Sequence, residues 1–189
     1  PDFGASIGPF AIISTADQFA NYEGGIIDVA SLGFMQVDEQ GNVNPSILPG
    51  RLPGPGGFPV ISYGSPRVIF AGGFTAGKRD IRIENGKLSI VKDGDIAKFV
   101  RKVYKVVYSG PFGLENGQEI IYVTERAVFR LTKKGLVLEE HAPGIDIEKD
   151  ILNRMEFEPE ISPKLREMEK RLFLPGRMNL REEAGLFRR

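Results

Sequence analysis

Two glycine turns hold the residues of this sequence that are best suited to chemistry. In the first, Gly54, Gly56 and Gly57 fall within four positions and leave backbone N–H groups uncovered, because glycine has no Cβ. In the second, Gly77 precedes Lys78 at the end of a buried-strand pattern. A strand that runs into a glycine turn is how α/β proteins build a cradle for an anion or a cofactor. We therefore expect both turns to border a binding site.

Several side chains near these turns have two interpretations each. Asn42 and Asn44 are either turn formers that bond their own backbone or contacts to a ligand. Lys78 is either solvated or placed to neutralise a phosphate. Glu125, at a predicted strand end, either supports the site through another residue or forms a surface salt bridge. Phe58 belongs to the core or to a pocket wall.

The residues that the sequence lacks limit the chemistry further. There is no cysteine, and His141 is the one histidine. This composition excludes disulfides, thiolate nucleophiles and zinc clusters, and it leaves no set of histidine bases from which a catalytic triad could be built. Carboxylates and backbone groups must therefore carry any reaction, and no metal site is expected.

The charge balance limits the partners. The 25 basic and 25 acidic side chains cancel, so neither nucleic acid nor an anionic membrane surface is an expected partner. No apolar run reaches the length of a membrane span, and the sequence as it begins shows no secretory leader. The absence of cysteine is compatible with a reducing compartment. We expect a cytoplasmic protein.

The 189 residues are enough for one core and predict one domain at 1–176 with a tail at 177–189. Residues 1–79 carry more than half of the 23 glycines and few charges, so this part is expected to form the buried sheet and its loops. The chain begins at Pro1 inside a loop-like stretch, and we expect the polypeptide to continue upstream.

Hydrophobic periodicity and turn residues predict an α/β fold with an open mixed sheet, an antiparallel hairpin region and C-terminal helices. Asn85-Gly86 predicts a type I′ turn within a hairpin over 80–92. Helices are expected at 15–22, with Thr15 as N-cap, at 58–63, at 146–155, with Asp146 as N-cap, and at 162–172. Strands are expected at 26–30, 34–37, 42–44, 67–72, 103–108, 119–124, 127–131 and 136–140. The last four are expected to form an antiparallel, half-exposed sheet.

A set of short segments, in this order and spacing, resembles the C-terminal half of the family I coenzyme A transferases. The likeness is to the fused-chain transferases for short-chain acyl-CoA of the acetoacetate, acetate and propionate type, and it extends from Phe3 to about Arg181. The segments that carry it are Tyr22-Glu23-Gly24-Gly25, Asp28, Leu32-Gly33, Gln36-Val37-Asp38, Gly41-Asn42-Val43-Asn44, Gly54-x-Gly56-Gly57-Phe58, Phe74-Thr75-Ala76-Gly77, Tyr122 to Leu131 and Ala142-Pro143-Gly144-Ile145-Asp146.

The resemblance implies the NagB/RpiA-like scaffold of that family and a ping-pong exchange of CoA. A glutamate carboxylate attacks the thioester of an acyl-CoA, and a glutamyl-CoA thioester follows. The glycine loop, through Gly56 or Gly57, is expected to give a backbone donor to the oxyanion. Coenzyme A is a substrate here and not a tightly bound cofactor. The candidate CoA contacts are Gly54, Phe58, Asn42, Asn44, Thr75 and Lys78, with Glu125 behind them.

The resemblance also places the nucleophilic glutamate upstream of Pro1, outside this chain. The expected partners are therefore an acyl-CoA, a short-chain carboxylate and the missing N-terminal half or a companion chain, in a homo- or hetero-oligomer. An alternative is a non-catalytic fragment or assembly subunit with the same fold. A third possibility is a relative that uses the same scaffold for sugar-phosphate isomerisation or nucleotide binding, which the fold alone does not decide.

Overall fold

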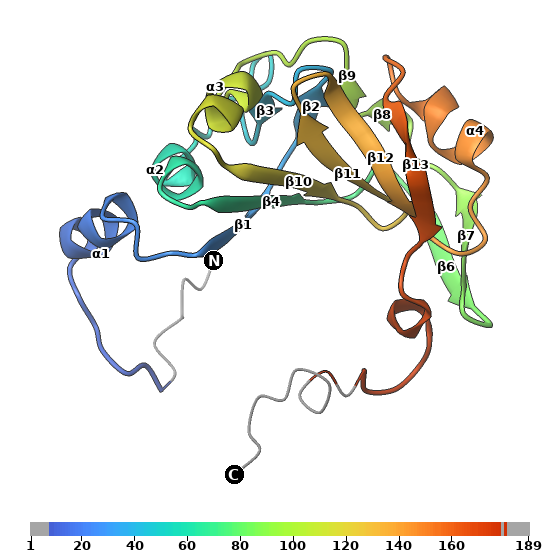
Figure 1. The fold of residues 1–189 in the computed structure, drawn as a ribbon, viewed down its shortest axis with the longest axis horizontal. Helices are drawn as coiled ribbons and strands as arrows, with labels where there is room; N and C mark the ends of the chain where they lie inside the picture. Colours follow the sequence, from blue (N-terminus) through green and yellow to red (C-terminus); the bar gives the residue numbers. More distant parts are fainter. Residues whose placement is uncertain (1–7, 179, 181–189) are drawn as a thin grey trace.

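A computed structural model describes residues 8–178 and 180 of the chain, and its centre is a six-stranded mixed sheet (Figure 1). The strand order is β1-β4-β10-β11-β12-β13. The strands span Val29–Gly33 (β1), Arg67–Ala71 (β4), Glu119–Val123 (β10), Ala127–Thr132 (β11), Gly135–His141 (β12) and Glu160–Glu167 (β13). The predicted α/β fold with an open mixed sheet is confirmed.

The sheet has a parallel part and an antiparallel part. Strands β1, β4 and β10 are parallel, β11 is antiparallel to β10 and to β12, and β13 is parallel to β12. The three parallel strands therefore end at one edge of the sheet, near Gly33, Ala71 and Val123. This is the edge at which open α/β sheets hold ligands, outside the carboxyl ends of their strands.

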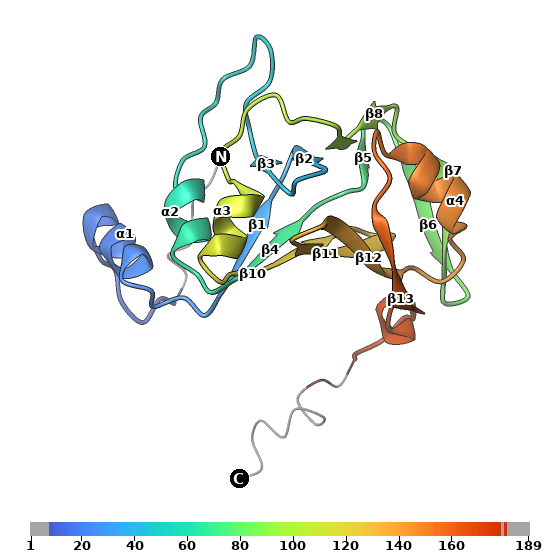
Figure 2. The ribbon, with the colours of Figure 1, turned by 45° about the horizontal axis from the view of Figure 1, so that its top comes forward.

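Two helices and a small sheet cover one face of the large sheet (Figures 1 and 2). The helices are α2 (Phe58–Tyr63) and α3 (Gly110–Glu115), and α1 (Thr15–Glu23) packs beside α2. The small sheet joins β2 (Gln36–Asp38), β3 (Val43–Asn44) and β9 (Phe99–Val100). None of the helices in the described part of the chain is long and apolar enough to span a membrane.

The core lies between these two layers and is rich in aromatic rings. Phe70 of β4 stacks on Tyr122 of β10 with ring centroids 5.5 Å apart, and Phe58 of α2 stacks on Phe70 at 5.6 Å. Phe74, Phe99 and Phe129 form a second buried group. Offset ring pairs of this kind contribute about 0.5–1.5 kcal/mol each beyond the apolar area that they bury.

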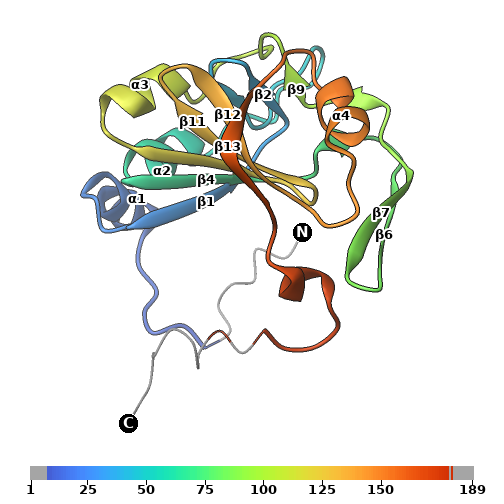
Figure 3. The ribbon, with the colours of Figure 1, turned by 45° about the vertical axis from the view of Figure 1, so that its right-hand side comes forward.

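The predicted hairpin over 80–92 is present, and the strands predicted at 34–37 and 42–44 form a second hairpin. Strands β2 and β3 pair across the turn at 39–42, and β6 (Asp80–Glu84) pairs with β7 (Lys87–Lys92). Asn85 and Gly86 have φ values of 53° and 74°, as a type I′ turn requires. The β6–β7 hairpin extends away from the large sheet (Figure 3). In the chain, β5 (Thr75–Ala76) precedes this hairpin and β8 (Ile96–Ala97) follows it, and these two strands pair with each other.

Four sequence predictions for local structure are wrong. Residues 103–108 form no strand, although Val103 and Tyr108 are buried, because their backbone is used in loop contacts to Asp38 and Val43. Residues 162–172 are not one helix: β13 extends to Glu167 and a 3₁₀ turn, η2, follows at Lys170–Phe173. Pairing with β12 and the extended preference of a residue before proline, here Ser162, outweigh the helical spacing.

The other two wrong predictions concern the N-terminal half. The strand predicted over 26–30 begins three residues later, at Val29, and it is an edge strand with Ile26 65% exposed. The half of the chain that is poorest in charge is therefore not uniformly buried. Strands 119–123, 127–132 and 135–141 are confirmed and pair antiparallel to one another as predicted, within the same six-stranded sheet that includes β1 and β4.

The Asp146-capped helix is confirmed in a shorter form. The Asp146 carboxylate accepts a hydrogen bond from the Lys149 N–H at 2.8 Å, and α4 spans Ile147–Asp150 before the 3₁₀ turn η1 at Leu152–Arg154. The first helix is also confirmed, with Ser14 as its N-cap instead of Thr15. Of the predicted tail at 177–189, residues 179 and 181–189 lie outside the described residues.

Gly41, in the β2–β3 turn, is expected to tolerate a side chain poorly. Its φ is 76°, and a Cβ there would lie 2.6 Å from Leu131 and 2.7 Å from the Tyr122 hydroxyl, which itself donates to the Gly41 carbonyl at 2.6 Å. Gly41→Ala should therefore lower the free energy of unfolding by about 2–4 kcal/mol, from backbone strain and overpacking together. Urea unfolding, monitored by circular dichroism, measures this change in the free energy of unfolding.

Gly117→Ala is the matched control. Gly117 has a φ of 75°, and a Cβ there would meet nothing within 4 Å. Gly117→Ala should lower the free energy of unfolding only through backbone strain, by about 1–2 kcal/mol. Equal losses in the two variants would mean that the packing around Gly41 relaxes freely.

Candidate functional site

The glycine loop lies at the end of the long connection between β3 and α2, the cyan loop that rises from the body in Figure 2. Gly54 and Gly56 have φ values of 81° and 54°, and a Cβ at either position would meet nothing within 4 Å. Within residues 8–178, the N–H groups of Gly54, Gly56 and Gly57 donate no hydrogen bond. Residues 54–56 of the bend are exposed to solvent, and Gly57 is half-buried.

Both ends of this loop are fixed by the protein. The Ser46 hydroxyl donates to the Gly54 carbonyl at 2.8 Å, and the Phe58 N–H donates to the Pro55 carbonyl at 3.1 Å. Gly57 is the N-cap of α2, and a Cβ there would lie 2.7 Å from the Phe19 ring of α1. The loop is therefore open on one side and held by α1 and α2 on the other.

Phe58 and the two asparagines serve the fold in this structure. Phe58 is buried and stacks on Phe70, which places it in the core and not in a pocket wall. The Asn42 amide donates to Asp38 at 3.1 Å and accepts from the Gly110 N–H at 3.2 Å. The Asn44 amide donates to Gln36 and to the Ile47 carbonyl, and its oxygen accepts two N–H groups of the following turn. Neither asparagine has an amide group left over for a ligand.

A second group of predicted residues lies where the parallel strands end. Glu125 follows β10, and its carboxylate accepts the Phe74 N–H and the Arg126 Nε–H, each at 2.8 Å. Thr75 is buried, and its hydroxyl donates to Asp93 at 2.6 Å. Lys78 is exposed and forms no ion pair with any described residue. The structure thus gathers Glu125 and Thr75 but leaves Lys78 in solvent.

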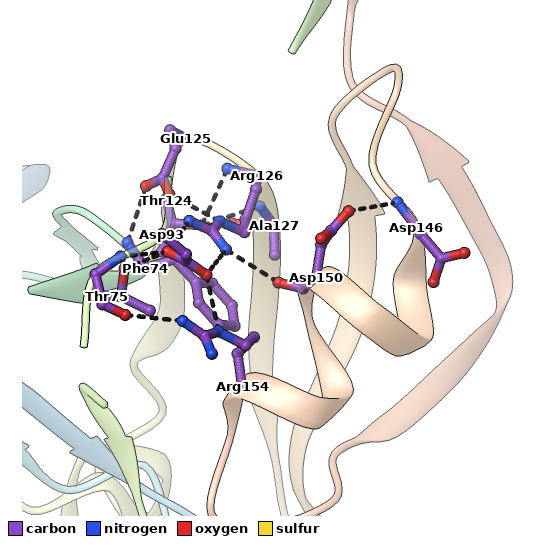
Figure 4. A network of polar contacts seen from close by, with 11 residues as sticks. Phe74, Thr75, Asp93, Thr124, Glu125, Arg126, Ala127, Asp146, Asp150 and Arg154 are labelled. Atoms are coloured by element: carbon purple, nitrogen blue, oxygen red, sulfur yellow. Dashed lines mark hydrogen bonds and ion pairs between the residues drawn. The ribbon is translucent and has the colours of Figure 1, made fainter. Parts of the chain in front are cut away.

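Arg126 is the centre of the network that joins these residues (Figure 4). Its side chain is fully buried, and its two terminal nitrogens donate to Asp93 at 2.8 Å each. Arg154 donates to the same carboxylate at 2.8 Å. Burial raises the pKa of Asp93, but hydrogen bonds from Arg126 and Thr75 outweigh it and hold that pKa well below its usual value. The network ties β10–β11 to the β5–β8 ladder and to η1.

Lys98 is a buried cation at the same edge of the sheet, between β8 and β9. It is 8% exposed, and its ammonium lies 3.9 Å from the centroid of the Phe34 ring. Burial, reinforced by the charge of Arg79 and opposed by that of Glu125, lowers the pKa of Lys98 to about 8. A depression of about 440 Å³ lies at the end of β4 and is lined by Gly72, Gly73, Arg79, Ile81 and Glu125. Gly72 also borders Lys98, because a Cβ at Gly72 would lie 3.0 Å from the Lys98 Nζ.

Two larger depressions contain none of the predicted site residues. The first, of about 830 Å³, lies between α3 and the β11–β12 turn and includes Glu39, Lys133 and Phe157. The second, of about 730 Å³, lies beside α4 and η1. The size of a depression is therefore not the criterion for the candidate site. The criteria are the open N–H groups of the glycine loop and the charged side chains where the parallel strands end.

Comparison with known proteins assigns the family. No family model matches the chain. The chain is 46% identical to acetate CoA-transferase YdiF of Escherichia coli K12 over 176 residues, which are 93% of this chain and 33% of that protein. It is 48% identical to caffeate CoA-transferase of Acetobacterium woodii over 178 residues, 92% of this chain and 34% of that protein. The chain belongs to the CoA-transferases.

A solved CoA-transferase structure has the same fold. The acyl-CoA transferase YdiF of Escherichia coli O157:H7, described as a thioester complex with CoA, superposes with a TM-score of 0.88 at 45% identity and covers 90% of this chain and 33% of that one. The chain thus spans about a third of the length of the relatives that it matches first. This confirms the predicted resemblance to part of a CoA-transferase.

Sequence reasoning found the glycine loop of this CoA-transferase segment and missed the charged edge. Lys98 interrupts the apolar stretch Ile96-Ala97-Lys98-Phe99-Val100, and a lone charge among apolar strand residues was the available signal. Asp93 and Arg154 gave no signal, since they meet Arg126 only in three dimensions. The roles predicted for Gly54, Gly56, Gly57, Thr75, Lys78 and Glu125 stay predictions.

Proposed function

We propose that this chain is the oxyanion-stabilising part of a short-chain acyl-CoA:carboxylate CoA transferase. The observation that supports it most is the exposed bend at 54–57, whose N–H groups find no acceptor among the described residues. A thioester carbonyl needs such donors when a carboxylate attacks it, because the oxygen then gains a full negative charge. The bend is held at both ends, so its donors are oriented before the substrate arrives.

The proposed reaction proceeds in four balanced steps. A glutamate carboxylate, supplied by the part of the enzyme upstream of this chain, attacks the thioester carbon. The carbon–sulfur bond breaks, CoA departs as the thiolate, and an acyl-glutamyl anhydride is formed. The thiolate then attacks the glutamyl carbonyl and releases the first carboxylate, which leaves a glutamyl-CoA thioester. A second carboxylate repeats the two steps in reverse order. Gly56 or Gly57 donates to the oxyanion at each attack.

Other parts of the proposal follow from the same assignment. Gly54, Thr75 and Lys78 are proposed to border the CoA, with Lys78 near its phosphates, whereas Phe58, Asn42 and Asn44 hold the loop and the turn beside it. Acetate CoA-transferase subunit beta of Escherichia coli K12, of which the chain covers 54%, supports a companion chain and an oligomer. A cytoplasmic location belongs to the proposal as well.

A trapping experiment tests this function. The chain alone and the complete protein that carries it are each incubated with acetyl-CoA and propionate, and propionyl-CoA is measured by chromatography. We expect transfer only by the complete protein, and a CoA thioester on a glutamate outside residues 1–189, converted by hydroxylamine to a hydroxamate that peptide mass spectrometry locates. A complete protein that neither transfers CoA nor forms this adduct is the non-catalytic alternative, and the proposal is then wrong.

A further inference from the structure

Gly72, which lines the depression at the end of β4, also borders the ammonium of Lys98. Lys98 is buried as a whole residue, and its ammonium donates no hydrogen bond to any described residue. The ammonium lies over the Phe34 ring, 3.9 Å from its centroid. No fully buried side-chain nitrogen or oxygen of the described residues lacks a hydrogen-bond partner, so solvent reaches the Lys98 ammonium. Its three donors are therefore available to an anionic ligand that replaces water.

Gly72 leaves this ammonium within reach of the depression. A Cβ at Gly72 would stand 3.0 Å from the Lys98 Nζ, and Gly72 itself lines the depression. Any larger residue would therefore fill the space in front of the cation. The glycine is needed here for close approach and not for backbone freedom, because its φ lies outside the left-handed region.

Two further donors surround the same space. The Gly73 N–H has no acceptor in the described part of the chain, and the Arg79 guanidinium lies directly against Gly73, where a Cβ would fall 1.8 Å from its Nη1. Glu125 accepts the Phe74 N–H and the Arg126 Nε–H and forms no hydrogen bond with Lys98, although its charge raises the pKa of that lysine. Lys98, Arg79 and Glu125 together carry a net charge of one positive unit, which matches a monoanion.

We propose that the Gly72 depression binds the carboxylate group of the organic acid that exchanges CoA, with Lys98, Arg79 and the Gly73 N–H as donors. This inference rests on the proposed function. Ile81, which also lines the depression, gives an apolar surface for a short hydrocarbon chain. A planar carboxylate with two to four carbons satisfies both the polar and the apolar side, whereas a phosphate would carry excess charge and make no use of Ile81.

Competitive lysine labelling tests the site without an activity assay. The complete protein is labelled with a trace amine reagent over pH 6–10, with and without propionate, and each lysine is quantified by peptide mass spectrometry. Lys98 should titrate near pH 8, and propionate should protect it and shift its titration upward, because a bound anion stabilises the protonated ammonium. The exposed Lys92 should change in neither respect. A Lys98 that stays equally reactive, or is protected as well by inorganic phosphate, overturns the proposal.

Variants give a second readout. Lys98→Met keeps the apolar stem and should weaken propionate binding about 10- to 100-fold, the scale of a hydrogen bond to a charged group. Gly72→Ala should weaken it similarly by blocking the ammonium. Lys98→Arg should restore part of the affinity, and Lys92→Met, the exposed control, should bind as the unmodified protein does. Unchanged binding in both Lys98→Met and Gly72→Ala contradicts the proposal.

The kinetic arm separates this inference from the proposed function. In an active transferase, Lys98→Met should raise the KM for the carboxylate and leave the KM for acyl-CoA unchanged. If transfer occurs but neither KM moves, the inference fails while the proposed function stands. If no transfer occurs and propionate still protects Lys98, the proposed function fails and the depression remains a carboxylate site.

Discussion

Gly56→Val and Gly57→Val are expected to slow CoA transfer by the complete enzyme about 100- to 1,000-fold, the usual effect of losing one oxyanion donor. At Gly56 the cause is the backbone: a φ of 54° is strained for valine, so the bend must change shape. At Gly57 the cause is contact, since the new side chain would meet the Phe19 ring at 2.7 Å. Single-turnover acyl transfer, measured by rapid quench, reports the chemical step directly.

Gly50→Val is the matched control for these two variants. Gly50 lies in the same long loop, has a φ of 70° and would have nothing within 4 Å of its Cβ. It should lose only the stability that backbone strain costs and keep a near-normal rate of transfer. Near-normal rates in Gly56→Val and Gly57→Val would remove the loop from the mechanism.

A proline identifies which glycine donates. The φ of Gly57 is −79°, which a proline ring accepts, so Gly57→Pro deletes the N–H with little change in backbone shape. Gly57→Ala keeps the N–H and adds a Cβ at the same place. Both variants carry the Cβ that meets the Phe19 ring, so the comparison between them isolates the N–H group. If Gly57 is the donor, the proline variant should be about 100-fold slower than the alanine variant, or more. Equal rates would assign the donor to Gly56.

Short-range patterns predicted the elements that local chemistry determines. The Asn85-Gly86 hairpin, the Asp146 cap and the helix that starts at Phe58 all follow from turn and capping preferences within a few residues. The glycine loop belongs to the same class, because three glycines in four positions indicate an uncovered backbone wherever they occur.

Long-range pairing decided what the patterns missed. Residues 162–167 have helical spacing, yet β12 offers them a strand edge, and residues 103–108 look like a strand but have no free edge to join. The same holds for side chains. Asn42 and Asn44 are as much turn residues as ligand contacts in sequence, and their hydrogen bonds to Asp38 and Gln36 show the first role. The sequence does not show that Lys98 belongs to a candidate site, because its ammonium meets Gly72 only in the folded structure.

Arg126→Met is expected to lower the free energy of unfolding by about 3–5 kcal/mol, the usual result of removing one partner of a buried ion pair. The methionine fills most of the volume but leaves Asp93 without its two hydrogen bonds of 2.8 Å, and it leaves Glu125 without the Arg126 Nε–H. Arg154 still reaches Asp93 but is partly exposed and compensates only in part. Urea unfolding of the complete protein, followed by fluorescence or circular dichroism, gives the value.

Arg166→Met is the matched control for this loss. Arg166 also pairs with a glutamate of the large sheet, Glu140, but its side chain is 75% exposed, so its removal should cost less than about 1 kcal/mol. The double variant Asp93→Asn/Arg126→Met should be less destabilised than the sum of its two single variants, because each single change leaves a buried charge unpaired and the double change does not. Additive losses would show that Asp93 and Arg126 act independently.

The pH dependence of the stability loss in Arg126→Met tests whether Asp93 is the carboxylate through which Arg126 stabilises the fold. The pKa of Asp93 is lower in the folded protein than in the unfolded one, so its contribution to stability is complete above the unfolded value, about 3.9, and is lost as the pH falls through the folded value. Arg126→Met removes that depression, so the stability gap between the two proteins should be constant from pH 6 to 8 and narrow below about pH 4. A gap of the same size at pH 3 and at pH 7 would mean that the arginine stabilises the fold through packing against Phe74, 4.9 Å from its guanidinium carbon, and not through Asp93.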